Sequence, residues 1–224
     1  MSDGSEGFDE LEEGTMTGRT ELELADWRRR VAGLYADVRA EADPATAHGL
    51  WRAGRDALFR EHPQSALPAG SPLRETGLPF WPYDPRFRFE VELAPVPEGT
   101  RALELPSGET GSTLLRAVGV VELPDPVGAS VTLWWLEQYA GGMFLPLRDG
   151  TAGDADPTAG SYGGGRYLLD TAKGADLGAH GSRLVVDLNF LYHPSCRYDD
   201  AWLCPLAPPE NTVSARVEAG ERMA

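Results

Sequence analysis

Short apolar or alternating runs, separated by turn-forming residues, occupy the chain from residue 86 onward. In RFRFEVEL, residues 86–93, Phe, Val and Leu alternate strictly with Arg and Glu, which is the pattern of a half-buried strand. Further strand candidates follow at residues 101–105, 114–123, 130–139, 142–147, 166–170, 183–192 and 212–220. Gly, Pro, Asp and Ser clusters separate them, without the crossover segments that parallel pairing requires. The sequence therefore predicts an antiparallel β-sandwich or barrel of about seven or eight short strands.

A helical segment precedes these strands. Between residues 24 and 38, apolar residues recur at three- and four-residue steps, which places them on one helix face. A second helix is expected to begin at Asp43 and Pro44, because Asp is a natural N-cap and Pro fits the first helical position. Pro63 and the prolines after it cannot continue this helix. The fold class predicted is mainly β with N-terminal α-helices, an α+β arrangement.

We expect a single domain over residues 21–224, with a helical segment at 21–62 and a β-domain at 78–224. Residues 1–20 are acidic and rich in Gly and Ser, so they cannot bury enough apolar surface to offset the entropy of ordering. They are predicted to form a disordered acidic tail.

The charge of the chain limits its partners. It carries 35 acidic and 20 basic residues, a net charge of −15, which argues against binding to nucleic acid or to anionic membranes. The sequence has no apolar run long enough to predict a membrane span, and the acidic N-terminus does not resemble a secretory signal. We expect a cytoplasmic protein whose partner is a small molecule, with no cofactor, and the sequence does not indicate an oligomeric state.

Both cysteines of the chain lie in one segment, NFLYHPSCRYDDAWLCPLAPPEN, residues 189–211. Cys196, Cys204 and His193 are ligands that suit zinc, although the spacing is not that of a zinc knuckle. The other reactive interpretations are a disulfide and a thiol nucleophile, Cys196 or Cys204 beside a base, for which His193 is close in sequence. The favoured interpretation is that both cysteines are small buried residues that pack a proline-rich loop. His62 is a weaker acid–base candidate, and a turn residue is the favoured alternative for it.

A second motif is SYGGGRYLLD, residues 161–170. The turn at Gly163–Arg166 offers a backbone nest for an anion, with the guanidinium closing over it, or it is simply a flexible turn. If strand 166–170 pairs as a hairpin with strand 183–190, an aromatic cleft with a few polar groups is expected between this turn and the cysteine segment. The predicted ligand-binding residues are Arg166, Tyr167, Asp187, Asn189, Tyr192, His193, Tyr198 and Trp202.

Several segments together resemble the family known as domain of unknown function 1684. They are HPQSAL, GLPFWPYDPRFRF, GGGRYLLD and DLNFLYHPSCRYDDAWLCPLAPPENTVSARVEAGE, and the resemblance extends from about residue 24 to residue 221. An Asn is common in the family where this chain has His193, which weakens the metal and Cys–His interpretations. The positions that fit the family pattern are Asp187, Asn189, Cys196, Cys204, Pro205 and Asn211. The resemblance implies a small, mainly β domain of unknown activity, and it transfers no catalytic residues.

Three functions fit these observations. The favoured one is binding of a small polar or anionic molecule. The first alternative is a hydrolase or transferase that uses Cys196 or His62, with a site near Gly163–Arg166 and Asp187–Cys204. The second is a partner-binding or scaffold protein that engages another chain through the two helices and the acidic tail.

Overall fold

The computed structural model describes residues 18–100, 102–107, 111–156 and 158–224. Two long helices open the described chain, α1 (Gly18–Ala40) and α2 (Pro44–Glu61), and a short α3 (Leu73–Thr76) follows. The start of α2 is the one predicted, because Asp43 accepts a hydrogen bond from the Thr46 backbone N–H at 2.8 Å and Pro44 opens the helix. Helix α1 already includes residues 18–20, which were assigned to the tail, and the rest of the predicted tail lies outside the described residues.

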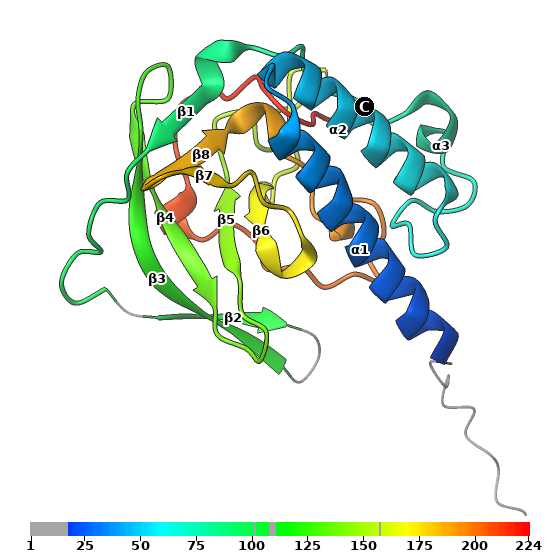
Figure 1. Ribbon diagram of the computed structural model, residues 1–224, viewed down its shortest axis with the longest axis horizontal. Coiled ribbons are helices and arrows are strands. Elements are labelled where there is room, and N and C mark those ends of the chain that lie inside the picture. Colours follow the sequence, from blue (N-terminus) through cyan, green and yellow to red (C-terminus); the bar gives the residue numbers. More distant parts are fainter. Residues whose placement is uncertain (1–17, 101, 108–110, 157) are drawn as a thin grey trace, which may run out of the picture.

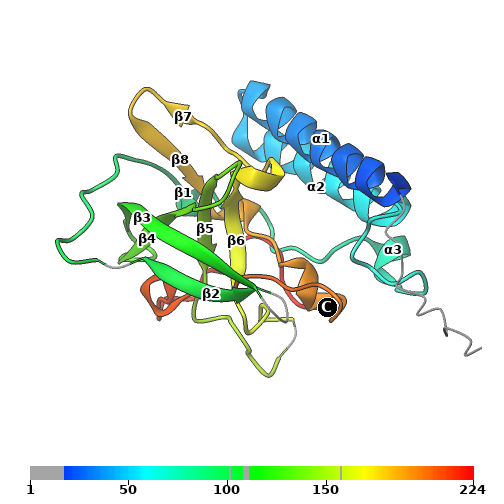
Figure 2. The same ribbon diagram turned by 90° about the horizontal axis from the view of Figure 1, so that it is seen from below.

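Within the described residues, eight strands form two antiparallel sheets. They are β1 (Arg88–Val91), β2 (Leu103–Ser107), β3 (Gly111–Leu123), β4 (Ala129–Leu136), β5 (Met143–Leu147), β6 (Arg166–Asp170), β7 (Ala179–His180) and β8 (Arg183–Asp187). One sheet has the order β2-β3-β4-β5-β6 and the other β1-β8-β7. Figures 1 and 2 show that α1 and α2 lie side by side against the β6 and β7–β8 side of the strands. The predicted fold class, mainly β with two N-terminal helices, is confirmed.

The hairpin expected between strand 166–170 and strand 183–190 is wrong. Strand β6 pairs with β5, whereas β8 pairs with β1 and β7. Strand β8 ends at Asp187 because the side chain of that residue accepts the Asn189 backbone N–H at 3.0 Å and begins a 3-10 turn. The chain then returns toward β6, where Tyr167 and Tyr192 exchange both backbone hydrogen bonds.

The strand expected at residues 212–220 is also absent from the described structure. This segment belongs to neither sheet: it forms an isolated bridge between Thr212 and Arg148, and most of its other polar groups bind outside a strand pairing. The Val217 and Ala219 carbonyls accept hydrogen bonds from a buried arginine of β6, and the Val217 N–H donates to the Asp149 carboxylate at 2.8 Å. The alternation seen in the sequence still places Val213, Val217 and Ala219 in the core.

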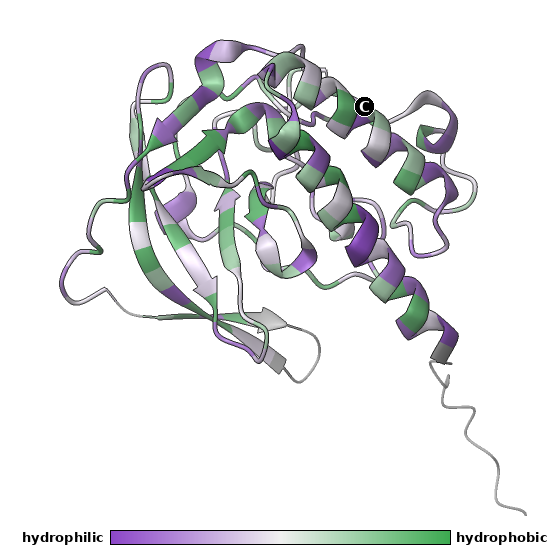
Figure 3. Ribbon diagram, viewed as in Figure 1, coloured by the Kyte–Doolittle hydropathy of each residue, from purple (hydrophilic) through white to green (hydrophobic). Residues whose placement is uncertain are grey.

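The main hydrophobic core lies between the sheets and the two long helices. Trp51 of α2, Leu133 of β4 and Leu168 of β6 are all almost fully buried there. A fully buried side chain of this size contributes about 1.5–3 kcal/mol. In Figure 3, α1 and α2 show hydrophobic and hydrophilic residues in turn along their length, as expected for helices with one buried face. Within the described residues, no helix is both long enough and apolar enough to cross a bilayer.

A second cluster packs on the other face of the five-stranded sheet, around Trp134 and Phe144. Asn211 joins the C-terminal segment to this part of the sheet. Its side-chain oxygen accepts from the Trp134 indole N–H at 2.7 Å, and its amide group donates to the Thr132 and Pro146 carbonyls, each at 2.8 Å. This buried side chain therefore ties the end of the chain to β4 and β5.

Candidate functional site

A cavity of about 70 Å³ lies between the α1–α2 pair and strand β6 at the edge of the five-stranded sheet. We call it the helix-sheet pocket. Helix α1 contributes residues 27, 31, 34 and 35, and α2 contributes residues 51, 55, 58 and 59, so the same helical spacing brings one face of each helix to the pocket. Strand β6 and the segment after β8 supply the opposite wall. The aromatic residues of the lining are Trp27, Tyr35, Trp51, Phe59, Tyr167 and Tyr192.

Arg55 is the central cation of the pocket. Its side chain is only 12% exposed, and its guanidinium carbon lies 4.4 Å from the centre of the Phe59 ring and 4.7 Å from that of Tyr192. One terminal nitrogen donates to the Glu221 carboxylate at 3.0 Å. The Arg55 Nε is buried and has no hydrogen-bond partner among the described residues, and the same holds for the Tyr35 hydroxyl. Two polar groups at this pocket are therefore left unsatisfied by the protein.

Glu221 forms the polar floor next to the pocket. This fully buried carboxylate contacts Arg55, accepts the His193 backbone N–H at 3.0 Å and lies 3.5 Å from His193 Nδ1. It also accepts a hydrogen bond from the Tyr198 hydroxyl. Burial alone would raise the pKa of Glu221, but Arg55 and His193 outweigh it and hold the pKa below its ordinary value. Glu221 is therefore a carboxylate whose charge is balanced inside the fold.

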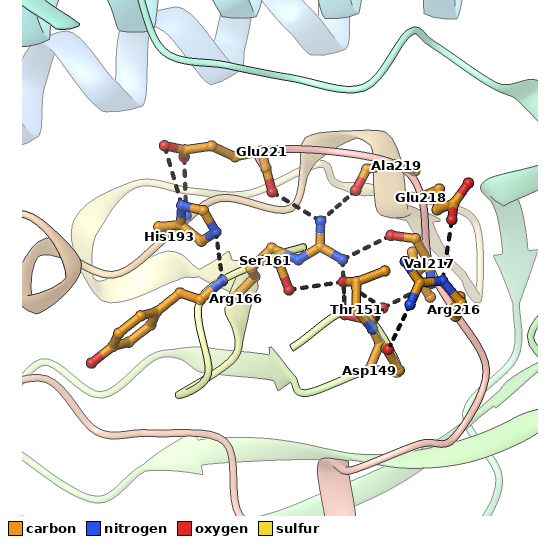
Figure 4. Close-up of polar contacts among 12 residues, drawn as sticks. Asp149, Thr151, Ser161, Arg166, His193, Arg216, Val217, Glu218, Ala219 and Glu221 are labelled. Atoms are coloured by element: carbon orange, nitrogen blue, oxygen red, sulfur yellow. Dashed lines mark hydrogen bonds and ion pairs between the residues drawn. The ribbon is translucent and has the colours of Figure 1, made fainter. Parts of the chain in front are cut away.

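His193 lines the pocket as a neutral ring. Burial, which outweighs the neighbouring Glu221 carboxylate, lowers the pKa of His193. Its Nε2 accepts the Tyr162 backbone N–H at 3.1 Å, so the proton of the neutral ring is on Nδ1, toward Glu221 (Figure 4). Both ring nitrogens are thus engaged within the protein.

The mouth of the pocket carries an ion pair. Lys173 Nζ lies 3.2 Å from the buried carboxylate of Asp170, while the lysine side chain is about half exposed. Both residues line the pocket. The lysine ammonium is therefore paired with Asp170, while its side chain reaches solvent.

Arg166, predicted to bind a ligand, is instead a buried structural cation. It is fully buried, and its terminal nitrogens donate to the Asp149 carboxylate at 2.9 Å and to the carbonyls of Val217, Ala219 and Glu221 (Figure 4). Its guanidinium carbon also lies 5.2 Å from the centre of the Trp81 ring. The predicted anion nest closed by this guanidinium is therefore wrong, because the side chain leaves the glycine turn and points into the core.

Asp187 and Asn189 lie away from the helix-sheet pocket. Asp187 accepts from the Tyr83 hydroxyl at 3.2 Å, and Asn189 exchanges hydrogen bonds with the backbone of Asp84. Burial raises the pKa of Asp187. These residues fasten the proline-rich segment before β1 to the end of β8, so they do not belong to the predicted cleft.

Of the predicted binding residues, the structure brings together Tyr167, Tyr192 and His193 at the pocket. Tyr198 stands just behind them, with its ring centre 5.5 Å from that of Phe59. Trp202 is half-buried and packs against the main core without lining the pocket.

The metal alternative at His193, Cys196 and Cys204 is not supported by the described part of the chain. No group of three or more His, Cys, Asp or Glu residues there could hold a metal ion, and both nitrogens of His193 are already engaged. Cys196 and Cys204 are free thiols. They are partly exposed and not fully buried, which corrects the interpretation of both as buried packing residues.

His62 matches the turn interpretation. It closes α2, its backbone N–H donates to the Leu58 carbonyl at 3.0 Å, and its Nδ1 accepts the Gln64 backbone N–H at 3.0 Å. The other ring nitrogen lies 3.4 Å from the Asp26 carboxylate. The side chain is buried, so it joins the end of α2 to α1.

The sequence analysis missed Arg55 and Tyr35. Polar residues such as His48 and Arg55 on a helix are usually solvated, yet His48 is buried and Arg55 is nearly so. A signal was present, since Arg55 follows Trp51 by four residues and therefore shares the face of that buried tryptophan.

Comparisons with known proteins support the family resemblance seen in the sequence. The model of a family described as Protein of unknown function (DUF1684) matches residues 75–222. The chain is also similar to a solved structure, the solution NMR structure of the uncharacterized protein from gene locus rrnAC0354 of Haloarcula marismortui, with 31% sequence identity. That similarity covers 77% of this chain and 90% of the other, with a TM-score of 0.52. No protein of curated function matches the chain.

Proposed function

This chain belongs to the DUF1684 family of proteins of unknown function, and we propose that it binds a small carboxylate-bearing molecule in the helix-sheet pocket. The apolar part of the ligand lies among the aromatic rings of the pocket. Its carboxylate accepts hydrogen bonds from Arg55 and Tyr35.

The observation that carries this proposal is the pair of unsatisfied groups at the pocket. Five buried side-chain polar atoms lack a partner among the described residues, and two of them, the Tyr35 hydroxyl and Arg55 Nε, belong to residues that line this one cavity. A buried polar group without a partner destabilises a fold by about 1–3 kcal/mol. A ligand that supplies an acceptor oxygen to these groups removes that cost.

The charges around the pocket favour a ligand with an anionic group over a ligand with a cationic group. Arg55 holds Glu221 through a single terminal nitrogen, so other donors of its guanidinium are free to bind a carboxylate. A ligand ammonium would face this cation instead, because Glu221 is already bound by Arg55, His193 and Tyr198. Lys173, half exposed and paired with Asp170, adds a second cation to the lining of the pocket.

The volume of the cavity limits how much of a ligand it can enclose. A dry cavity of about 150 Å³ accommodates benzene, so this cavity of about 70 Å³ encloses a fragment of a few heavy atoms. Acetate, propionate and butyrate are therefore suitable probes. A longer natural ligand would extend through the mouth past Lys173.

The test is calorimetric titration of the full chain with acetate, propionate and butyrate, with n-butylamine as the control of opposite charge. We expect the carboxylates to bind and the amine not to bind. Failure of all three carboxylates to bind, or equal binding of the amine, would overturn the proposal.

A matched pair of variants locates the site. Tyr35→Phe removes the unsatisfied hydroxyl and is expected to weaken butyrate binding about tenfold, the effect of one hydrogen bond to a charged group, while stability is kept or increased. Tyr83→Phe removes a hydroxyl that binds Asp187 outside the pocket, and it should leave butyrate affinity unchanged. Equal affinities of Tyr35→Phe and the wild-type chain would place the carboxylate elsewhere.

A further inference from the structure

The two free thiols are brought together by the fold. Cys196 lies in a 3-10 turn (Ser195–Arg197), and its backbone N–H donates to the Cys204 sulfur at 3.4 Å. Standard bond lengths then place the Cys204 sulfur within about 5 Å of the Cys196 Cα. The side chains of Cys196 and Cys204 also contact each other, so the two thiols are neighbours, as a disulfide between them requires.

The segment between the thiols is held in place at both ends. The Arg197 N–H donates to the Pro194 carbonyl and the Trp202 N–H to the Asp199 carbonyl, so successive turns fold it back on itself. Beyond Cys204, the Pro205 carbonyl accepts the hydroxyl of Tyr167 from β6. The pair is therefore preorganised by the native fold and does not depend on a chance encounter of flexible chains.

We propose that Cys204 and Cys196 form a thiol–disulfide exchange site, in which Cys204 attacks a small-molecule disulfide and Cys196 resolves the mixed disulfide. The two thiols have different surroundings, and this assigns their roles. The Cys204 sulfur accepts the Cys196 backbone N–H, so a hydrogen-bond donor already points at the sulfur of the attacking residue. Burial, and then the adjacent Cys204 sulfur, raise the pKa of Cys196 to about 11, which favours Cys196 as the thiol that reacts second.

The surface around Cys204 is open to a small substrate. Leu203 is 66% exposed and Leu206 is 44% exposed, and Cys204 between them is partly exposed. Exposed apolar side chains on both sides of a thiol favour a substrate that brings an organic group with its disulfide. This site is separate from the helix-sheet pocket, and its chemistry does not require a ligand there.

The reaction balances in two exchange steps. Cys204 loses its proton, and its thiolate attacks one sulfur of the substrate disulfide; the S–S bond breaks, and the first half leaves as a thiolate that then takes up a proton. Cys196 then loses its proton and attacks the Cys204 sulfur of the mixed disulfide, which releases the second thiol and forms the Cys196–Cys204 bond. The two protein thiols are oxidised by two electrons in total, and the substrate disulfide is reduced by two.

The experiment is to incubate the full reduced chain with glutathione disulfide as the probe and to follow it by intact mass spectrometry. We expect loss of two hydrogen atoms from the monomer and loss of both thiols toward iodoacetamide. Disulfide-linked dimers as the main product, or no reaction in excess probe, would overturn the proposal.

Two conservative variants test the assigned roles. Cys196→Ser retains the attacking thiol and is expected to accumulate a mixed disulfide with glutathione. Cys204→Ser is expected to form such an adduct about tenfold more slowly, because the remaining thiol is the one that keeps its proton. Equal adduct rates in the two variants, with melting temperatures equal to that of the wild type, would refute the roles.

Discussion

Lowering the pH from about 7.5 to about 5 is expected to remove about 2 kcal/mol of folding stability through His48 alone. This histidine of α2 is only 3% exposed, and its ring centre lies 5.3–6.1 Å from those of four aromatic residues. Its Nε2 is buried without a partner among the described residues. Burial, and then the positive charge of Arg52, lower the pKa of His48 from 6.5 to about 4.

The sign follows from which state binds the proton. In the unfolded chain His48 takes up a proton as the pH falls through 6.5, whereas in the folded chain it resists protonation down to about pH 4. The free energy of unfolding therefore falls across this window and is unaffected by His48 above it. At about 1.36 kcal/mol per pH unit, the full loss is about 3 kcal/mol, of which about 2 kcal/mol is reached by pH 5.

The assay is urea unfolding, followed by tryptophan fluorescence, at about pH 7.5 and about pH 5. His48→Gln removes the titrating group, so its loss of stability between the two pH values should be about 2 kcal/mol smaller than that of the wild type. His180→Gln is the matched control, because His180 is exposed beside Glu90, and it should lose about as much stability as the wild type. The reasoning about burial is refuted if His48→Gln and His180→Gln lose the same amount.

Two further substitutions test the buried polar contacts of the fold by urea unfolding. Asn211→Ala leaves the Trp134 indole N–H and two backbone carbonyls without partners. It should therefore lower the free energy of unfolding by about 3 kcal/mol. A loss below about 1 kcal/mol would show that water replaces these contacts. Arg166→Met leaves the Asp149 carboxylate buried without its cation, and it should destabilise by about 3–5 kcal/mol. Adding Asp149→Asn to Arg166→Met should then recover part of this loss, whereas further destabilisation would contradict an electrostatic origin.

Local patterns in the sequence were sufficient to predict most elements of the fold. The alternation at residues 86–93 corresponds to β1, and the Asp43–Pro44 pair marks the start of α2. These signals work because the period of side chains along an element, and the capping of its ends, depend on neighbours only a few residues away. The same signals failed at residues 212–220, where the backbone binds distant side chains at Val217 and Ala219 and only scattered backbone groups, among them Arg148 and Gly150, elsewhere.

The candidate site was predicted only in part. Tyr167, Tyr192 and His193 do meet at one pocket, because β6 and the segment after β8 exchange backbone hydrogen bonds. Arg55 and Tyr35 were missed, since they come from helices whose position relative to the sheet has no signature in the sequence. Both residues reach the pocket because one face of each helix closes on the same cavity.

The sequence by itself determined the helices, most of the strands, the antiparallel class and the family of this protein. Only the tertiary structure decided what its charged groups and thiols do. Arg166 follows a glycine turn that looked like an anion site, yet its guanidinium binds the carbonyls of residues 217, 219 and 221, more than 50 residues along the chain. Cys204 contacts Cys196 because turns fold the intervening segment back on itself. The physical reason is the same in both cases: a polar side chain acts on whatever the fold places within about 3 Å of it, and that partner need not be near in sequence.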